Sequence, residues 1–346
     1  MPLLLDTARS SRTVELRGNA ISIGLVNNMP DAALEATERQ FVDLIRATTA
    51  KAVVYLKLFS IPEVPRADNV RRALAGRYRD ISELWDTRLD GLIVTGTEPR
   101  AERLSDEPYW TTLSNIVDWA RENTTSTIFS CLAAHAAVLH ADGIERRPLV
   151  QKCFGVFDCD VLAAHALTKD LGPRLLVPHS RYNDLPEQAL VASGYRVLTR
   201  SDAAGVDLFA RQEGDHRSLF LFLQGHPEYE AGTLLREYRR DVARFLRGER
   251  EHYPTDPLGY FGDAVEKILS EFRARASRNR SEDLIADFPM SILEASLEGR
   301  WRGSAANIYE NWLCYLSRRK TVGRAKILND TAREAGRLAE PKAADG

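Results

Sequence analysis

Cysteine is scarce in this sequence. Its 346 residues include four cysteines, which are Cys131, Cys153, Cys159 and Cys314. No two of them form a CxxC pair, and no group of cysteines and histidines has the spacing of a zinc site. The sequence therefore excludes a disulfide-rich scaffold, and it predicts a reducing compartment and no metal site.

Long hydrophobic runs and a surplus of one charge are also missing. No apolar run reaches the roughly 18 residues that span a bilayer. The N-terminal leucine run has neither a basic region before it nor a small-residue cleavage site, so we expect no signal peptide. The formal net charge of −2 gives no electrostatic reason to expect nucleic acid or an anionic membrane as partner. We expect a soluble, cytoplasmic protein.

Strand and helix patterns alternate in the first half of the chain. Apolar strands are predicted at 20–26, 52–59, 91–95 and 126–130, and helices at 32–47, 109–122 and 132–141. This alternation predicts an α/β fold in which a parallel sheet carries helices on both faces. Ligands bind at the carboxyl ends of such strands. Three segments should meet there, namely residues 27–31, residues 96–101 and the turn at Cys131.

The second half has shorter strand patterns and one strong helix. We predict strands at 149–157, 175–177, 195–199, 207–210 and 218–223, of more antiparallel character, a helix at 233–250 and a polar loop at 276–284. No Gly/Ser linker separates the halves. We therefore predict a single domain over residues 1–320, followed by a charged, flexible tail over 321–346.

Cys131 stands where an apolar strand meets a helix. A thiol at such a turn lies at the carboxyl edge of the sheet, and the helix dipole favours its thiolate. The backbone N–H of Leu132 is then available as an oxyanion-hole donor. The alternative interpretation of Cys131 is a small buried hydrophobic residue, as most free cysteines are.

A histidine and a glutamate follow the last predicted strand. His226 and Glu228 are separated by Pro227, which holds the two side chains in a fixed relation. With Cys131 they suggest a Cys-His-Glu triad of nucleophile, base and orienting carboxylate. The alternative is a loop histidine beside a solvated glutamate.

The order Cys, His, Glu along the chain is that of class I glutamine amidotransferases. Those enzymes place glycines around the cysteine in a Gly-x-Cys-x-Gly setting, whereas Phe129 and Ala133 stand here. This departure argues against a glutaminase.

More specifically, the sequence resembles the homoserine O-succinyltransferase family, amidotransferase-like acyltransferases of methionine biosynthesis. The motifs that carry the resemblance extend from about residue 20 to 316; they are DGLIVTG at 90–96, YW at 109–110, TSTIFSC at 125–131, GV at 155–156, PHSRY at 178–182, GHPEY at 225–229, RD at 240–241, WR at 301–302, Asn307 and NWL at 311–313. The resemblance implies an amidotransferase-like fold and O-acylation of L-homoserine.

The resemblance also implies roles for individual residues. Cys131 would form the acyl thioester, His226 would be the general base and Glu228 its orienting partner. Substrate-binding positions fall on Lys152, Ser180 and Arg240, and Thr97 joins Leu132 in the oxyanion hole. From the residues alone, Lys152 and Arg240 are equally explained as solvated surface charges and Ser180 as a turn residue.

Arg100 occupies the position that influences the acyl donor in this family. Succinyl transfer is associated with glycine there and acetyl transfer with glutamate, so arginine is a departure. A guanidinium beside the acyl pocket would pair with the free carboxylate of a succinyl group, which favours succinyl-CoA; the alternative is a solvated loop arginine. Residues 259–297 also form a longer connection than the family usually has.

We therefore expect an O-acyltransferase that holds no bound cofactor and uses an acyl-CoA, either succinyl-CoA or acetyl-CoA, as co-substrate. Small-molecule substrates are its expected partners, and related enzymes imply a homodimer. Alternatives are L-serine or another amino alcohol as acceptor, a glutamine amidotransferase-like hydrolase, and an inactive relative that only binds an amino acid.

Overall fold

A mostly parallel sheet forms the centre of the protein. The computed structural model describes residues 3–7, 20–48, 52–214 and 218–338, with side chains up to residue 322. Within these residues an 8-stranded sheet has the order β1-β3-β2-β4-β5-β12-β11-β8. Its strands are β1 (Leu3–Asp6), β2 (Ile21–Val26), β3 (Val54–Phe59), β4 (Leu89–Val94), β5 (Thr124–Ser130), β8 (Arg196–Val197), β11 (Leu208–Gln212) and β12 (Leu219–Leu223). Neighbours from β1 to β12 in this order are parallel, and β11 and β8 are antiparallel.

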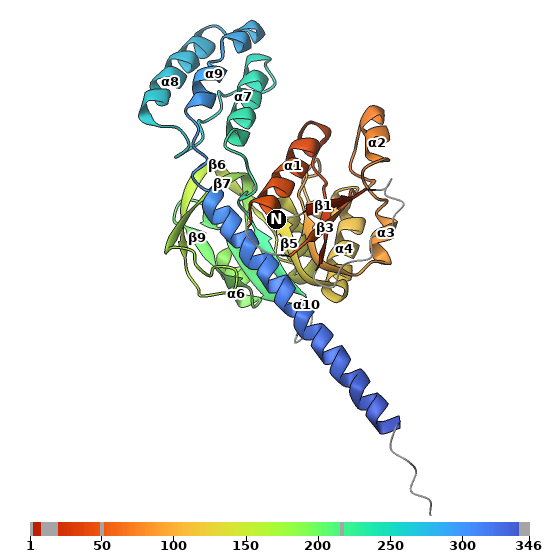
Figure 1. Cartoon of the computed structure of the whole chain (residues 1–346). Helices are drawn as coiled ribbons and strands as arrows, with labels where there is room; N and C mark the ends of the chain where they lie inside the picture. Colours follow the sequence, from red (N-terminus) through yellow and green to blue (C-terminus); the bar gives the residue numbers. More distant parts are fainter. Residues whose placement is uncertain (1–2, 8–19, 49–51, 215–217, 339–346) are drawn as a thin grey trace, which may run out of the picture.

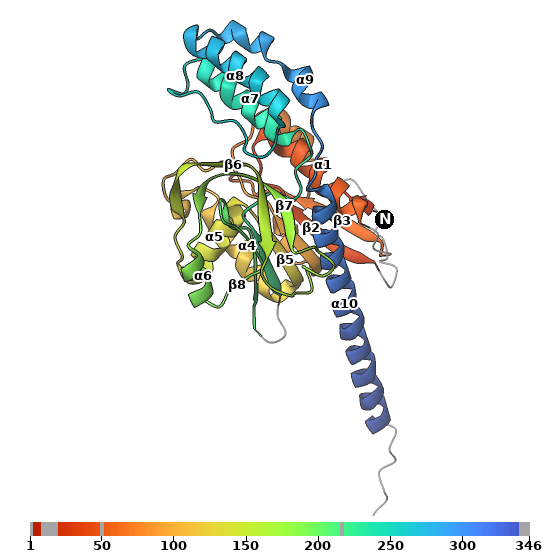
Figure 2. The same ribbon diagram turned by 90° about the vertical axis from the view of Figure 1, so that its left-hand side faces the viewer.

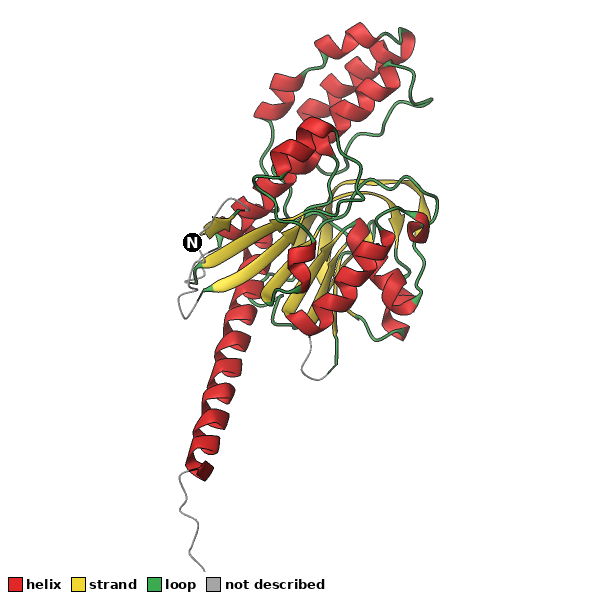
Figure 3. Ribbon diagram, turned by 90° about the vertical axis from the view of Figure 1, so that its right-hand side faces the viewer, coloured by secondary structure: helices red, strands yellow, loops and turns green. Residues whose placement is uncertain are grey.

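Helices cover both faces of this sheet, as Figure 3 shows. One face packs against α1 (Asp31–Ala47) and α10 (Arg302–Leu338), and the other packs against α4 (Trp110–Asn123) and α5 (Leu132–Asp142). Every residue of β2 and β12 is buried, which explains why these strands are continuous apolar runs. Shorter helical segments on the connections are α2 (Asp68–Leu74), α3 (Ser82–Trp85), η1 (Leu104–Asp106) and α6 (Glu187–Ala192).

A second sheet follows β5 in the chain. Its 4 strands have the order β10-β9-β6-β7 and are all antiparallel; they are β6 (Arg147–Val161), β7 (Arg174–Asp184), β9 (Thr199–Ser201) and β10 (Gly205–Val206). The antiparallel character predicted for the second half is thus correct for this sheet, but β12 is parallel to β5 and completes the main sheet. The predicted fold class is confirmed.

Helices α7 (Thr233–Leu246), α8 (Asp263–Arg278), η2 (Glu282–Asp287) and α9 (Met290–Ala295) form a cap above the sheets (Figures 1 and 2). They share a core of their own, which includes Phe154 and Val156 of β6. Two predictions need correction here. The helix predicted to reach residue 250 ends at Leu246, since Gly248 adopts a φ of 83°. The loop predicted at 276–284 begins inside α8 and ends inside η2.

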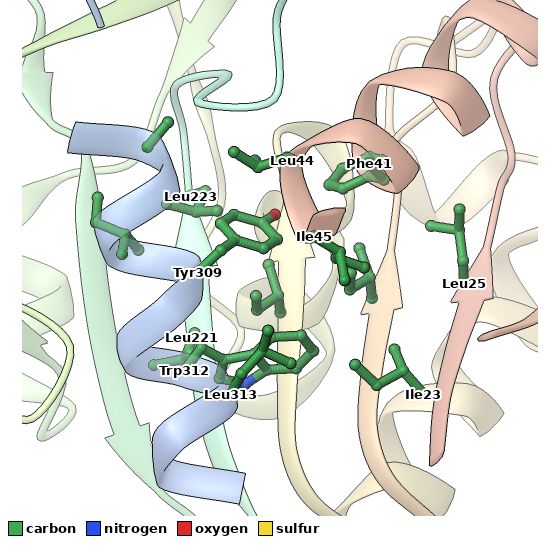
Figure 4. Close-up of a cluster of buried hydrophobic side chains, with 14 of the residues drawn as sticks. Ile23, Leu25, Phe41, Leu44, Ile45, Leu221, Leu223, Tyr309, Trp312 and Leu313 are labelled. Atoms are coloured by element: carbon green, nitrogen blue, oxygen red, sulfur yellow. The ribbon is translucent and has the colours of Figure 1, made fainter. Parts of the chain in front are cut away.

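Helix α10 returns from the cap to the sheet and packs beside α1 (Figure 4). Trp312 is fully buried and donates from Nε1 to Ser126 Oγ at 3.0 Å. Gly91 permits this approach, because a Cβ there would lie 2.8 Å from the Trp312 ring. The boundary predicted after residue 320 falls within α10, which continues to Leu338 and extends away from the body (Figure 1). The division into one domain and a tail stays a prediction.

Candidate active site

Cys131 is the single residue between β5 and α5. Its φ of 53° and ψ of −115° are unusual for an L-residue, and among described non-glycine residues only Asp170 shares a positive φ. The Cys131 N–H donates to the Leu223 carbonyl at 2.7 Å, which continues the pairing of β5 with β12. This strained turn sets a partly exposed thiol at the carboxyl edge of the sheet.

Backbone donors surround this turn. The Gly96 backbone approaches α5 so closely that a Cβ would lie 2.9 Å from Leu132 Cβ and 3.0 Å from Leu132 N. Thr97 follows directly. In the described part of the chain, neither the Leu132 N–H nor the Thr97 N–H donates a hydrogen bond. Both N–H groups that we predict to form an oxyanion hole are therefore free to donate, and that of Leu132 directly follows Cys131 in the chain.

His226 reaches Cys131 from the neighbouring strand. Leu223 at the end of β12 pairs with Ser130 at the end of β5, so the residues that follow leave the sheet at the same edge. His226 Nδ1 lies 2.7 Å from Glu228 Oε1, and the imidazole also hydrogen-bonds the Cys131 side chain. Both His226 and Glu228 are buried, which rules out a solvated loop pair. The structure thus brings the three predicted catalytic residues together.

Charges around His226 favour its protonated form. Burial opposes a charged imidazole, but the Glu228 carboxylate and the Cys131 sulfur outweigh burial and raise the pKa of His226 well above its usual value. The resting site therefore favours an imidazolium at His226, beside the Cys131 sulfur. Because Cys131 supplies part of this effect, the pKa of His226 should fall once the sulfur is acylated.

Tyr229 and Glu237 extend the site toward the cap, and sequence analysis missed both. The Tyr229 ring stacks on the His226 ring with centroids 4.3 Å apart and planes at 16°. Its hydroxyl donates to Glu237 Oε1 at 2.7 Å. The sequence did not predict a role for Glu237, because a single glutamate on a charged helix is typical of a solvent-exposed helix face.

Two of the predicted substrate-binding residues meet at Glu237. Ser180 Oγ donates to Glu237 Oε2 at 2.5 Å, and Lys152 Nζ lies 3.6 Å from the same oxygen. Lys152 is only 12% exposed and stands 3.9 Å from the centroid of the Phe154 ring, so it is not a solvated surface lysine. Arg240 directly precedes Asp241 in the chain, and its Nη2 lies 3.0 Å from Asp241 Oδ1.

A buried polar network supports the loop that carries His226. The Gly225 N–H donates to Asp207 Oδ1 at 3.2 Å, and Thr199 Oγ1 donates to Asp207 Oδ2 at 2.7 Å. Gln224 Oε1 lies 2.9 Å from His135 Nε2. Burial raises the pKa of Asp207 to about 6 and lowers that of His135 to about 4. His135 is thus a structural hydrogen-bonding residue.

The loop after β4 lines a cavity of about 520 Å³. Thr97, Arg100 and Glu107 are among its lining residues. The buried Glu107 carboxylate fixes the loop by accepting the N–H of Arg100 at 2.5 Å and of Ala101 at 2.8 Å. The Arg100 side chain is exposed, so the structure places it at the cavity without assigning it a partner.

A second guanidinium, missed by sequence analysis, interacts electrostatically with Cys131. Arg146 is half-buried within electrostatic reach of Tyr109, Glu107 and Cys131. Burial lowers its pKa, and among the described residues it makes no hydrogen bond or ion pair. A half-buried guanidinium with no direct ion pair is available to an anionic ligand.

The described residues offer neither a metal site nor a membrane-spanning helix. No three or more His, Cys, Asp and Glu side chains are placed there to hold a metal ion. No helix in those ranges is long and apolar enough to cross a membrane.

The sheet topology and the Cys-His-Glu arrangement define a class I glutamine amidotransferase-like protein. The family model "Homoserine O-succinyltransferase" matches residues 5–322. Relatives of that name are 50% identical in Rhodopseudomonas palustris, over 91% of this chain and 94% of the relative, and 48% identical in Bradyrhizobium japonicum, over 86% and 90%. The chain therefore belongs to the homoserine O-succinyltransferase family, whose members are acyltransferases. A glutamine amidotransferase structure from Methylobacillus flagellatus is similar at 16% identity and a TM-score of 0.48, over 86% of this chain and 95% of that one.

Proposed function

We propose that the protein transfers the succinyl group of succinyl-CoA to the hydroxyl of L-homoserine, a step of methionine biosynthesis, through a thioester on Cys131. Family membership supports the reaction class. The observation that carries the mechanism is the Cys131 thiol at the strained turn, hydrogen-bonded to a histidine that Glu228 holds.

The first half-reaction forms the acyl-enzyme. The Cys131 thiolate attacks the thioester carbonyl, and the N–H groups of Leu132 and Thr97 stabilise the oxyanion. The new C–S bond forms as the bond to the CoA sulfur breaks. The CoA sulfur takes the proton of the His226 imidazolium, so CoA leaves as a thiol and His226 becomes neutral.

The second half-reaction regenerates the thiolate. Neutral His226 removes the hydroxyl proton of homoserine as its oxygen attacks the thioester carbonyl. The C–S bond breaks, and Cys131 leaves as the thiolate, which again faces a protonated His226. Glu228 holds the imidazole in orientation through both steps, because its carboxylate accepts a hydrogen bond from the Nδ1–H group.

The polar groups above His226 suit an amino acid. We assign the α-ammonium of homoserine to the Glu237 carboxylate, which now binds Ser180 and Tyr229. The α-carboxylate is assigned to Lys152 and Arg240. Opposite charges 3.6 Å apart at Lys152 and Glu237 match the two charges of a zwitterion.

The test measures acylation of Cys131. Purified protein incubated with succinyl-CoA should gain the mass of one succinyl group at Cys131, and should then release O-succinylhomoserine when L-homoserine is added. Cys131→Ala should show neither, while the control Cys153→Ala should retain both. Turnover by Cys131→Ala would remove the mechanism. Acetyl-CoA and L-serine are tested in parallel, and release of ammonia from glutamine would indicate an amidohydrolase instead.

The homodimer, which the resemblance implies, and the cytoplasmic location, which the composition indicates, remain predictions. Light scattering of the purified chain, which should give the mass of two copies, checks the first. Fractionation of the source cells checks the second.

A further inference from the structure

Four cations surround the carboxylate of Asp241 on α7. Arg240 Nη2 lies 3.0 Å and Arg244 Nη1 3.9 Å from Oδ1, and Lys152 Nζ lies 3.3 Å and Arg250 Nη1 3.4 Å from Oδ2. We call these five residues the Asp241 cluster. They come from β6, from α7 and from the segment after it.

The Asp241 cluster has more positive than negative charge. Asp241 is only 3% exposed; burial raises the pKa of its carboxyl, but Lys152, Arg240 and Arg250 outweigh burial and lower it. Further carboxylates near these cations are Glu237, 3.6 Å from Lys152, the exposed Glu98, 3.9 Å from Arg244, and the exposed Glu249, which pairs with Arg247 and also interacts with Arg244. With Arg247 included, five cations face four carboxylates, so a positive surplus remains. Such a surplus attracts anions.

Two of the four cations donate no side-chain hydrogen bond within the described part of the chain. Lys152 and Arg240 donate to Asp241 at 3.3 Å and 3.1 Å. The guanidinium groups of Arg244 and Arg250 donate none within the described part of the chain, and they are 36% and 32% exposed. A guanidinium with free N–H groups offers the planar fork that binds phosphate with two hydrogen bonds.

The cap holds Arg250 in place. Arg280, which follows α8, donates from Nε to the Phe245 carbonyl at 2.5 Å and from Nη2 to the Arg250 carbonyl. Its guanidinium also lies 4.4 Å from the centroid of the Phe245 ring. The connection at 259–297 therefore contributes to the position of Arg250, which lowers the entropic cost of ligand binding there.

The Asp241 cluster lies between the two substrate regions. Lys152 connects it to Glu237, where the amino-acid acceptor is assigned. Arg244 connects it to Glu98, which with Thr97 lines the cavity at the loop after β4. An anionic group bound at Arg244 would therefore lie next to this loop.

We infer that Arg244 and Arg250 bind the phosphate groups of the acyl-CoA donor. This inference rests on the proposed function, because it requires a CoA thioester as substrate. Homoserine has a single carboxylate, which Lys152 and Arg240 suffice to bind. CoA has a pyrophosphate and a 3′-phosphate, whose charges match the two remaining guanidinium groups.

The test compares two donors that share the thioester but differ in the phosphates. Arg244→Gln and Arg250→Gln should each raise the KM for succinyl-CoA about tenfold, with kcat and the KM for homoserine unchanged. With succinyl-pantetheine, which has no phosphates, both variants should equal the unmodified enzyme. Arg239→Gln, on the exposed face of the same helix, is the control and should change neither donor. Added salt should raise the KM for succinyl-CoA less in the variants.

Three results would overturn the inference. The variants could raise the KM for succinyl-pantetheine as much as that for succinyl-CoA. They could raise the KM for homoserine instead. Finally, they could leave the KM for succinyl-CoA unchanged. Arg244→Lys and Arg250→Lys preserve the charge that offsets Asp241, so their intermediate KM values separate phosphate binding from loss of folding.

Direct binding separates this inference from the proposed function. Calorimetry with CoA, dephospho-CoA, pantetheine and inorganic phosphate needs no turnover. Tight CoA binding that weakens in Arg244→Gln supports the inference even if no acyl transfer to homoserine is seen. Equal affinity for CoA and inorganic phosphate would show a general anion site and would contradict it.

Discussion

At the scale of single residues, Glu228 and Cys131 both favour the protonated form of His226, and Glu228 is the larger of the two influences. Glu228→Gln removes the carboxylate that raises the pKa of His226, so the acid limb of the kcat profile should move to lower pH. The maximal kcat should fall about 10²-fold, because the imidazole loses its orientation. A pH profile with saturating substrates measures both effects.

Glu230→Gln is the matched control for this change. Glu230 lies two residues further along and pairs with the exposed Arg39 at 2.9 Å, away from the imidazole. Its profile should coincide with that of the unmodified enzyme. An unshifted acid limb in Glu228→Gln would mean that Glu228 does not set the protonation of His226.

If the donor is succinyl-CoA, as we propose, two arginines are candidate partners of the succinyl carboxylate. Arg100 is exposed, whereas Arg146 is half-buried within electrostatic reach of Cys131, so an ion pair to Arg146 is screened less by water. We expect Arg146→Gln to lower kcat/KM for succinyl-CoA about tenfold more than for acetyl-CoA, and Arg100→Gln to change this ratio less. The reverse order would assign the carboxylate to Arg100, as the sequence predicts. Arg103→Gln, exposed and paired with Glu145, is the control.

Residues that follow strand ends were predictable, and those on the cap were not. Cys131 and His226 each follow a buried strand, and parallel strands bring their carboxyl ends to one edge. Tyr229 stacks on His226, and its hydroxyl donates to Glu237. Neither contact produces a periodic sequence pattern, so neither could be predicted. Asp241 lies on a charged helix, a pattern that predicts solvent exposure. It is nevertheless buried, because the charges of Lys152, Arg240 and Arg250 offset its own.

At the scale of elements, α10 closes one face of the sheet. Trp312→Ala removes a fully buried indole and its hydrogen bond to Ser126, so the free energy of unfolding should fall by about 3–5 kcal/mol. Urea unfolding measures the loss. Val322→Ala, exposed on the same helix, should change it by less than about 0.5 kcal/mol. Equal stabilities for the two variants would mean that α10 is not part of the cooperative core.

The central elements were predictable because their sequences show their burial. Strand β12 is apolar throughout and β2 is apolar except for Ser22, since helices cover both of their faces. Strand β1 was missed because it is a short edge strand of four residues, too few for a pattern. Helices α8 and α9 were missed because they bury narrow stripes against α7 and leave charged faces exposed.

At the scale of the whole molecule, buried histidines should make stability depend on pH. Burial lowers the pKa of His135 from 6.5 to about 4, so the unfolded chain binds a proton in this window that the folded chain does not. Stability should therefore fall by up to about 3 kcal/mol as pH drops from 6.5 to 4. Burial lowers the pKa of His179 as well, which adds a loss of the same sign.

Protonation of Asp207 stabilises the folded chain as the pH falls, so it reduces the loss of stability that the histidines cause. Its pKa is raised from 3.8 to about 6, so between these values the folded chain binds the extra proton and gains stability as pH falls, by about 3 kcal/mol. Asp207 thus offsets about one histidine, while His179 and His165, whose pKa burial also lowers, leave a net loss in acid. His135→Gln should then reduce the loss of stability between pH 7 and 5 in urea unfolding, whereas His252→Gln, at an exposed site, should retain the full loss. Identical pH slopes in the two variants would show that His135 takes up no proton on unfolding.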